Sequence, residues 1–315
     1  KGENLSILEL IKEDFSNSVD CIYIDPPYNN QEKYRHYDDD LSHQQWLESI
    51  SERVKVLKGF LKDHGSMWVS IDDKEMHYLK VELDKVFGRK NFITTITWEH
   101  RTTRDNRVTF SNNHEYILVY AINPKKFRSK RNLLDLTPEI LNRYKNPDND
   151  PRGAWQSVSA NVQDGHAVAS QYYTITSPSG KKHTPPNGRC WCFNQSKMEK
   201  EINSNNIWFG LNGDGVPRLK KFLTASKPGV TPQTFWPADK VGTTKQAKKH
   251  ILKLFENQPV FDTPKPESLI KEILFIATNE GDLVLDAYLG SGTTAAVALS
   301  STPPMTHRLT CEYPV

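Results

Sequence analysis

The chain has 315 residues, which is long enough to bury one large core or two smaller ones. Hydrophobic residues make up 37% and charged residues 25%, a composition typical of a folded globular protein and not of a disordered one. The formal net charge of +3 is small, so a nucleic-acid-binding surface would have to come from a local excess of basic residues. No stretch has the apolar length of a membrane span, and Lys1 to Leu10 lacks the basic head and apolar run of a signal peptide. We therefore expect a cytoplasmic protein with no membrane partner.

Residues 1–122 alternate between expected strands and helices, which is the pattern of a parallel α/β sheet. An apolar strand at Val19–Ile24 ends at Asp25, because the two prolines that follow cannot continue a sheet ladder. A helix is expected over Gln44–Leu61, where apolar residues recur on one side. The other elements expected here are a strand at Ser66–Ile71, a helix at Lys74–Phe87, and strands at Asn91–Trp98 and Tyr116–Ala121.

Residues 123–237 have a different character, with scattered prolines, glycines, asparagines and basic residues. Only short strands are expected there, such as Tyr172–Thr176. Aromatic residues recur through the segment, which indicates a folded inserted module and not a disordered linker. They are Trp155, Tyr172, Tyr173, Trp191, Phe193, Trp208, Phe209 and Phe222.

The α/β pattern returns in residues 238–315. The expected elements are a helix at Glu267–Thr278, a strand at Leu283–Leu285 ending in Asp286, a helix from Thr293 to Leu299, and a strand at His307–Cys311 ending in Glu312. Neither the cysteines nor the histidines have the spacing of a metal site, since Cys190 and Cys192 are too close together for a zinc knuckle. No metal is therefore expected.

A strand, a glycine turn and a helix follow one another from Asp286 to Thr294. Glycines at such a turn let the backbone approach a ligand beyond the carboxyl end of the strand. A phosphate ligand is disfavoured, because the Walker lysine and the three-glycine dinucleotide pattern are absent and Asp286 would repel a diphosphate. The acid suits a positively charged ligand group, such as the amino group of S-adenosylmethionine. Glu312 alone would be an ordinary surface acid, but paired with this turn it is expected to accept hydrogen bonds from ribose hydroxyls.

The loop Asp25-Pro26-Pro27-Tyr28 follows a different strand. An exocyclic amine of a nucleobase is a poor nucleophile, because its lone pair is delocalised into the ring. The Asp25 carboxylate and the Pro26 carbonyl could accept its two N–H bonds, and the prolines would hold both acceptors in place. Tyr28 offers a flat face on which an extruded base can stack. The structural alternative is a tight turn with a capping aspartate and a core tyrosine.

With both motifs present, the sequence resembles the beta group of DNA amino-methyltransferases. In that group the catalytic half comes first, the target-recognition region second and the cofactor half last. The corresponding segments here are 1–122, 123–237 and 238–315. The resemblance implies a Rossmann-like S-adenosylmethionine-dependent methyltransferase fold, α/β in class. Its sheet would be seven-stranded, mostly parallel and circularly permuted, with an inserted target-recognition region.

Further stretches resemble family segments: Gly2–Leu5, which contacts the cofactor adenine, Phe261–Pro266, which lines the methionine pocket, and Asn113–Tyr116, near the target base. The family usually has aspartate where Glu3 stands. The cofactor-binding residues implied are Glu3, Thr263, Lys265, Pro266, Asp286, Tyr288, Gly290, Ser291, Gly292, Thr293 and Glu312. Those implied at the substrate are His114, Arg101, Arg104 and Arg107, beside the catalytic Asp25, Pro26 and Tyr28.

Ser70–Asp73 and Trp208–Lys220 resemble the modification subunits of type III restriction systems, which implies a natural protein longer at one or both ends. The resemblance implies double-stranded DNA as the substrate, a restriction-subunit partner and, by analogy, a homodimer in a bacterial, nucleoid-associated setting. Basic residues expected to grip DNA also include Lys125, Lys126, Arg128, Lys130, Arg131, Lys181 and Lys182.

Aspartate at the first motif position is usual for adenine-N6 enzymes, whereas serine is typical of cytosine-N4 enzymes. The expected reaction is therefore direct methyl transfer to N6 of a flipped adenine. Three alternatives stay open: a cytosine-N4 methyltransferase, a catalytically silent DNA-binding subunit of the same fold, and an RNA or protein methyltransferase.

Overall fold

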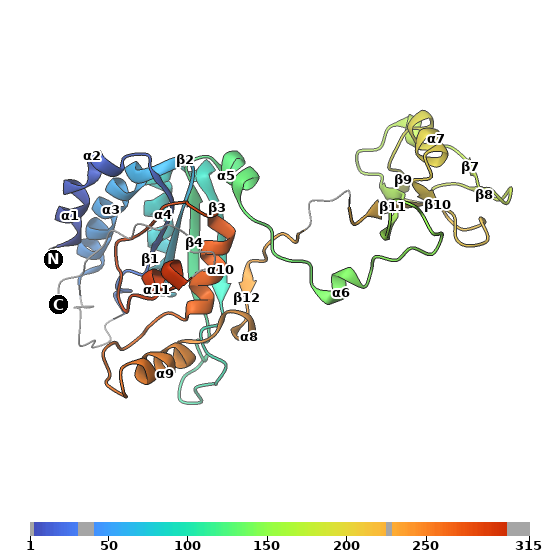
Figure 1. The fold of residues 1–315 in the computed structure, drawn as a ribbon. Helices are drawn as coiled ribbons and strands as arrows, with labels where there is room; N and C mark the ends of the chain where they lie inside the picture. Colours follow the sequence, from blue (N-terminus) through green and yellow to red (C-terminus); the bar gives the residue numbers. More distant parts are fainter. Residues whose placement is uncertain (1–2, 31–40, 225–228, 301–315) are drawn as a thin grey trace. The chain divides into compact units, whose positions relative to one another are not determined.

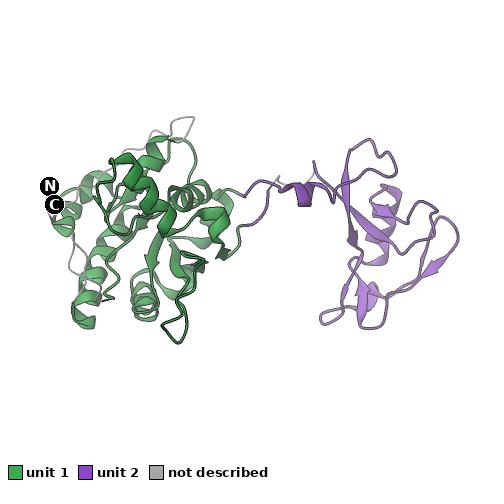
Figure 2. Cartoon of the chain, turned by 90° about the horizontal axis from the view of Figure 1, so that it is seen from below, with its two compact units in different colours: residues 1–132, 232–315 green, residues 133–231 purple. Residues whose placement is uncertain are grey.

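The computed structural model describes residues 3–30, 41–224 and 229–300. The chain divides into two compact units, shown in Figure 2. The first unit is formed by the chain up to Asn132 and from Pro232 onward, and the second is Leu133–Thr231. The second unit covers fewer residues than the inserted region 123–237 expected from the sequence. One reason is that the residues just before Leu133 form a helix that packs on the sheet of the first unit.

The first unit is built around a six-stranded sheet, counted over the described residues (Figure 1). In spatial order its strands are β12 (Phe235–Trp236), β3 (Phe92–Trp98), β4 (Glu115–Ala121), β2 (Leu61–Ile71), β1 (Val19–Ile24) and β13 (Val284–Asp286). Only β4 runs against its neighbours, and the other adjacent pairs are parallel. The α/β class and the mostly parallel sheet are therefore confirmed. The further strand expected at His307–Cys311 lies outside the described residues, as does Glu312.

Helices surround this sheet. They are α1 (Asn4–Leu10), α2 (Lys12–Phe15), α3 (His43–Phe60), α4 (Met76–Phe87), α5 (Pro124–Lys130), α8 (Ala238–Val241), α9 (Thr244–Leu254), α10 (Glu267–Ala277) and α11 (Thr293–Ser300), with a 3₁₀ turn at Arg89–Asn91. Helix α3 begins with a capping box made by Ser42 and Gln45. Its residues Trp46, Ile50 and Val54 recur every four positions and are buried.

The core of the first unit lies on both faces of β1, whose residues are all buried. Ile22 and Ile24 pack with buried side chains of α3 and α4 in one cluster. Cys21 and Tyr23 alternate with them, so they point to the opposite face, and helix α10 contacts the strand as well. A parallel strand covered on both faces leaves its carboxyl end open at the sheet edge, which is where ligands bind in such sheets.

The second unit has its own small sheets and its own core. Its elements are α6 (Pro138–Leu141), β5 (Trp155–Ser159), β6 (Asn161–Gln163), η2 (Ala169–Gln171), β7 (Ile175–Thr176), β8 (Lys182–His183), β9 (Arg189–Trp191), α7 (Gln195–Asn203), β10 (Ile207–Trp208) and β11 (Arg218–Phe222). Strands pair in the order β10-β11-β5, and as β6-β9 and β7-β8. Buried side chains, among them Trp191 and Met198, form a cluster separate from the first core.

The strand expected at Tyr172–Thr176 is shorter than predicted. The Tyr172 N–H bonds back to the carbonyl of Ala169 at 3.2 Å, so this residue closes a 3₁₀ turn and the ladder begins only at Ile175. None of the helices in the described ranges combines the length and the apolar character that a membrane crossing requires.

Candidate active site

The loop Asp25–Tyr28 leaves the end of β1 and is anchored by neighbouring helices. The indole of Trp46 in α3 donates a 2.8 Å hydrogen bond to the carbonyl of Pro27. Asn29, in the left-handed region at φ 56°, donates a 2.8 Å bond to Glu75 at the start of α4. The loop is therefore held in one shape, as a set of preorganised acceptors requires.

The segment between β13 and α11 forms the tight turn expected from its glycines. Gly290 has φ 56°, and a Cβ there would lie 3.2 Å from the ring of Phe261, so both conformation and space favour glycine. Asp286 is buried, and its Oδ1 accepts a backbone N–H two residues along the chain at 2.9 Å. The Thr293 hydroxyl donates at 3.1 Å to the carbonyl of Lys265, which ties this turn to the start of α10.

The sheet brings these two loops together. Strands β1 and β13 are parallel neighbours, with Tyr23 opposite Asp286, so the segments that follow them leave the same edge. Asp25 and Gly290 accordingly line one pocket of about 530 Å³ within the first unit. The predicted site residues that line it are Asp25, Pro26, Tyr28, Arg101, His114, Thr263, Lys265, Asp286, Tyr288, Gly290, Ser291 and Thr293.

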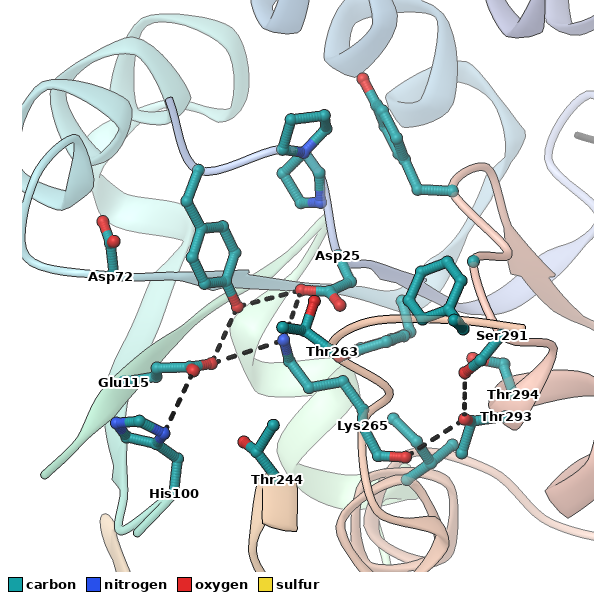
Figure 3. Close-up of a pocket in the computed structure, with 18 of the residues that line it drawn as sticks. Asp25, Asp72, His100, Glu115, Thr244, Thr263, Lys265, Ser291, Thr293 and Thr294 are labelled. Carbon is teal, nitrogen blue, oxygen red and sulfur yellow. Dashed lines mark hydrogen bonds and ion pairs between the residues drawn. The ribbon is translucent and has the colours of Figure 1, made fainter. Parts of the chain in front are cut away.

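A cluster of charged groups fills the middle of the pocket (Figure 3). The Lys265 ammonium lies 2.9 Å from Asp25 Oδ1 and 3.4 Å from Glu115 Oε2. It also lies 4.9 Å from the centre of the Tyr28 ring, within reach of a cation–π interaction. The His100 Nδ1 is 3.6 Å from Glu115 Oε1, an ion-pair distance that is too long for a hydrogen bond.

Burial raises the pKa of three aspartates in the pocket, which favours their neutral forms. Burial is the largest influence on Asp25 and raises its pKa, against the opposing effect of the Lys265 ammonium. Burial also raises the pKa of Asp286 to about 7 and that of Asp72 to about 6. Burial lowers the pKa of His100, so its imidazole is neutral at neutral pH. Among the described groups Asp286 forms no ion pair, so a bound cation would stabilise its carboxylate.

Several predicted residues lie outside the pocket lining. Glu3 caps the start of α1 and pairs with Arg53, although its neighbour Asn4 reaches the carbonyl of Ala287 at 3.2 Å, next to the glycine turn. Pro266 precedes the first turn of α10. The others outside the lining are Gly292, Arg104 and Arg107, of which Arg107 is exposed and pairs with Asp105.

The structure also brings residues to the pocket that the sequence did not single out. The most informative is Glu115, the first residue of β4, which pairs with Trp98 at the end of β3. The first residue of an antiparallel strand lies at the edge of the sheet where the parallel strands end. A prediction that considers only residues following the ends of strands therefore misses Glu115. Its position next to His114 in the family-like stretch Asn113–Tyr116 was the available signal. His100 and Asp72 follow β3 and β2 in the usual way.

The basic residues of α5 lie at the end of the first unit's sheet opposite to the pocket. Strand β4 begins at the pocket with Glu115 and ends at Ala121, which pairs with Ser66 near the opposite edge. Helix α5 follows that end, as Figure 1 shows, and its role in DNA binding stays a prediction. In the described ranges no cluster of His, Cys, Asp and Glu has metal-binding geometry, and the cysteines there are free.

A model of the N6/N4 methyltransferase family, described as "DNA methylase", matches residues 19–302. Among curated proteins, the Mod subunit of the type III restriction-modification enzyme StyLTI of Salmonella typhimurium is 32% identical over 95% of this chain and 49% of its own length. The type II methyltransferase M.KpnI of Klebsiella pneumoniae is 27% identical over 94% of this chain and 75% of its own length. The chain thus spans about half the length of the type III relative.

Among solved structures, the cytosine-N4-specific PvuII DNA methyltransferase is similar with a TM-score of 0.50 and 12% identity. The alignment covers 98% of this chain and 78% of that one. At this identity the likeness concerns the fold, and it agrees with the sheet described above.

Proposed function

The chain belongs to the N6/N4 DNA methylase family, and on that premise we propose that it transfers a methyl group from S-adenosylmethionine to N6 of an adenine flipped out of double-stranded DNA. The observation that carries the proposal is the shared pocket: the Asp25 loop and the Gly290 turn, far apart in sequence, line one cavity. The relatives named Mod subunits support a place in a restriction-modification system with a restriction-subunit partner, in the cytoplasm beside the bacterial chromosome. A homodimer is proposed by family analogy.

The glycine-turn side of the pocket fits the methyl donor. Asp286 is a buried carboxyl that accepts a backbone N–H and has no cationic partner among the described residues, which suits the donor's amino group. Gly290 leaves room beside Phe261 for a close ligand. When bound, S-adenosylmethionine supplies a methyl group activated by its positively charged sulfur. The residues expected to hold it here also include Thr263, Tyr288, Ser291 and Thr293.

The Asp25 side of the pocket fits the acceptor amine. Asp25 Oδ1 already accepts the Tyr28 hydroxyl at 2.9 Å and the Lys265 ammonium at the same distance, so it is positioned to accept N–H groups. Accepting the amine's N–H bonds keeps its lone pair directed at the donor. The ring of Tyr28 stacks the flipped base, while Arg101 and His114 lie at the rim on the segments between β3 and β4.

DNA recognition is assigned to the inserted region 123–237, whose compact part is Leu133–Thr231. Arg101, Arg104 and Arg107, on the loop between β3 and β4, are proposed to contact phosphates near the target base. Phosphate contacts of this kind make binding fall steeply with salt.

The first prediction concerns Asp25→Asn, which keeps the side chain's shape but removes the carboxylate. Methyl transfer should fall by roughly 10²–10³-fold, the usual loss when one preorganised electrostatic group is removed. The measurement is transfer of labelled methyl groups to amplified bacterial genomic DNA, which carries short sites unmethylated, followed by analysis of the nucleosides. N6-methyladenine is the expected product.

Asp14→Asn, an exposed acid in α2, is the matched control and should keep full activity. Full activity of Asp25→Asn would exclude the mechanism. N4-methylcytosine in the digest would move the assignment to the cytosine-N4 branch of the family. Binding of the donor and of DNA without any methylated product would identify a silent subunit.

A further inference from the structure

The Tyr28 hydroxyl stands between two carboxyl groups. It lies 2.9 Å from Asp25 Oδ1 and 2.9 Å from Glu115 Oε2. A phenol carries one hydrogen, so it can donate to only one of these oxygens at a time. The second contact becomes favourable when the other carboxyl carries a proton and donates it to the phenol oxygen. One additional proton, held by Asp25 or Glu115, therefore allows both contacts of the Tyr28 hydroxyl to be hydrogen bonds.

The charges around this trio also favour uptake of one proton. Asp25 and Glu115 as carboxylates and Lys265 as an ammonium give the cluster a net charge of minus one, with His100 neutral. One added proton makes the cluster neutral, which burial favours. The charged and titratable groups that line the pocket around it are Tyr23 from β1, Asp72 after β2, His100 and Arg101 after β3, His114 before β4, Lys265 before α10, Asp286 at the end of β13 and Tyr288 after it.

The proposed reaction produces a proton that must leave the buried amine. The carbon–nitrogen bond forms as the sulfur–carbon bond breaks, and the positive charge of the sulfur passes to the amine. The amine then loses one of its two hydrogens as a proton, which leaves neutral methylated adenine and the neutral thioether. Asp25, which accepts the amine's N–H, is the first group that the proton can reach.

We propose that Glu115 is the second proton acceptor of this site. The surplus proton passes from the amine to Asp25, and Asp25 hands it on as the Tyr28 hydroxyl donates its own hydrogen to Glu115. The Asp25 carboxylate is restored while the product is still bound. Glu115 acts on the amine only through Asp25 and Tyr28, so it is a positioning and proton-accepting residue and not a direct contact of the substrate. The assignment rests on the methyltransferase function proposed above.

The test measures the rate of a single turnover from pH 5 to pH 9, with excess full-length enzyme, tritiated S-adenosylmethionine and amplified bacterial genomic DNA. In the unsubstituted protein the rate should fall at low pH, because the carboxyl pair becomes protonated and cannot accept another proton. In Glu115→Gln the plateau rate should fall by about 10-fold or more, somewhat below the loss expected for a direct base. The fall of the rate at low pH, which is the acid limb of the pH–rate profile, should also move to lower pH. The reason is that removing the Glu115 charge lowers the pKa of Asp25.

Tyr28→Phe keeps the stacking ring but removes the hydroxyl link, so it should lose a similar factor. The double variant Tyr28→Phe/Glu115→Gln should be no slower than the slower single variant, because one path is interrupted twice. Glu99→Gln is the matched control: Glu99 also follows β3 and accepts the Ala238 N–H at 2.9 Å, but it contacts neither carboxyl of the pair. It should keep the rate and the acid limb.

An unchanged plateau in Glu115→Gln would overturn the proposal, and so would a lower plateau with an unmoved acid limb, which is the result of a purely structural role. Multiplying losses in the double variant would overturn it as well. Asp25→Asn, run in parallel, separates the two levels of inference. If Asp25→Asn is inactive and Glu115→Gln is normal, only the proton path fails; if Asp25→Asn is fully active, the proposed chemistry itself fails.

Discussion

At the scale of single residues, the pocket contains two acids in different surroundings, the half-buried Asp25 and the buried Asp286. Asp25 is paired with the Lys265 ammonium, whereas Asp286 is surrounded by hydrogen-bond donors and has no cation among the described groups. Burial raises the pKa of both. A buried carboxyl without a cationic partner destabilises the ligand-free protein when it is ionised. A bound cation removes this destabilisation.

The pH dependence of donor binding should therefore report Asp286. Burial raises the pKa of this group to about 7, so its carboxylate forms as pH rises through neutrality. If only the ionised form binds the donor's amino group, affinity should rise about eightfold from pH 6 to pH 7.5, in proportion to the ionised fraction. Calorimetry with S-adenosylmethionine measures this, and Asp286→Asn should bind weakly with no such rise.

The same group has the opposite effect on stability. A pKa raised in the folded state contributes stability at low pH that is lost as pH rises through the folded value. Asp286→Asn should therefore raise the melting temperature of the donor-free protein most at pH 8, and the gain should shrink steadily as the pH falls toward about 4. Asp282→Asn, two residues before the start of β13, is the control and should leave the pH dependence of donor binding intact. If the donor affinity of Asp286→Asn rose with pH as much as that of the unsubstituted protein, Asp286 would not be the group that binds the donor's amino group.

At the scale of elements, helix α3 anchors the loop Asp25–Tyr28. Its N-terminal capping box orients the first turn, and Trp46 in that turn reaches the carbonyl of Pro27. Loop and helix come from opposite sides of residues 31–40 in the sequence, so this contact joins parts that are not adjacent in the chain. The hydrogen bond therefore acts on the position of Asp25.

Replacing Trp46 by Phe should keep most of the buried ring and remove this bond, at a cost of about 1 kcal/mol. Because the loop then loses one anchor, methyl transfer should slow several-fold, up to about 10-fold, while donor affinity stays the same. Trp236→Phe is the matched control, since its indole donates at 2.9 Å to the carbonyl of Gln233, away from the loop. Both variants should melt at lower temperature by similar amounts. Equal loss of transfer rate in the two would show that the anchor has no special role.

At the scale of the whole molecule, each of the two units carries its own stabilising interactions. In the second unit the Lys220 ammonium is completely buried, pairs with Asp148, and lies 3.1 Å from Asp150 Oδ2. Arg152 also binds Asp150, with Nε 2.9 Å from Oδ1 and Nη2 2.8 Å from Oδ2. None of these residues lines the pocket of the first unit. Loss of one buried partner should therefore weaken the second unit alone.

Lys220→Met leaves two acids without their buried partner and should destabilise the second unit by on the order of 3–5 kcal/mol. Scanning calorimetry should show one transition at lower temperature and a second unchanged. S-adenosylmethionine should raise only the unchanged transition, because it binds the first unit. Lys221→Met, the exposed neighbour on the same strand, should change neither. A single transition shifted by both Lys220→Met and the donor would mean that the units unfold together.

Much of this molecule follows from local sequence. The expected helices and strands of the first unit match α3, α4, β3, β4, α10 and α11 within two residues, because apolar periodicity, caps and glycines act over short distances. Strand β2 is longer than expected, since it begins at Leu61 and not at Ser66. The same local signals placed Asp25 after one strand and Gly290 after another. In the inserted region the apolar pattern is weak, and the strand predicted from Tyr172 was too long because that residue closes a 3₁₀ turn and only Ile175 and Thr176 pair with β8.

What the sequence by itself determined was the identity of the two loops and the chemistry that each can perform. Only the tertiary structure decided which other groups share their pocket. Glu115 reaches Asp25 because β4 runs against its neighbours, and Lys265, which the sequence placed with the cofactor-binding residues, pairs with Asp25 from a segment more than two hundred residues along the chain. The direction of a strand and the meeting of distant segments depend on how the whole sheet pairs, and no local pattern of residues encodes that pairing.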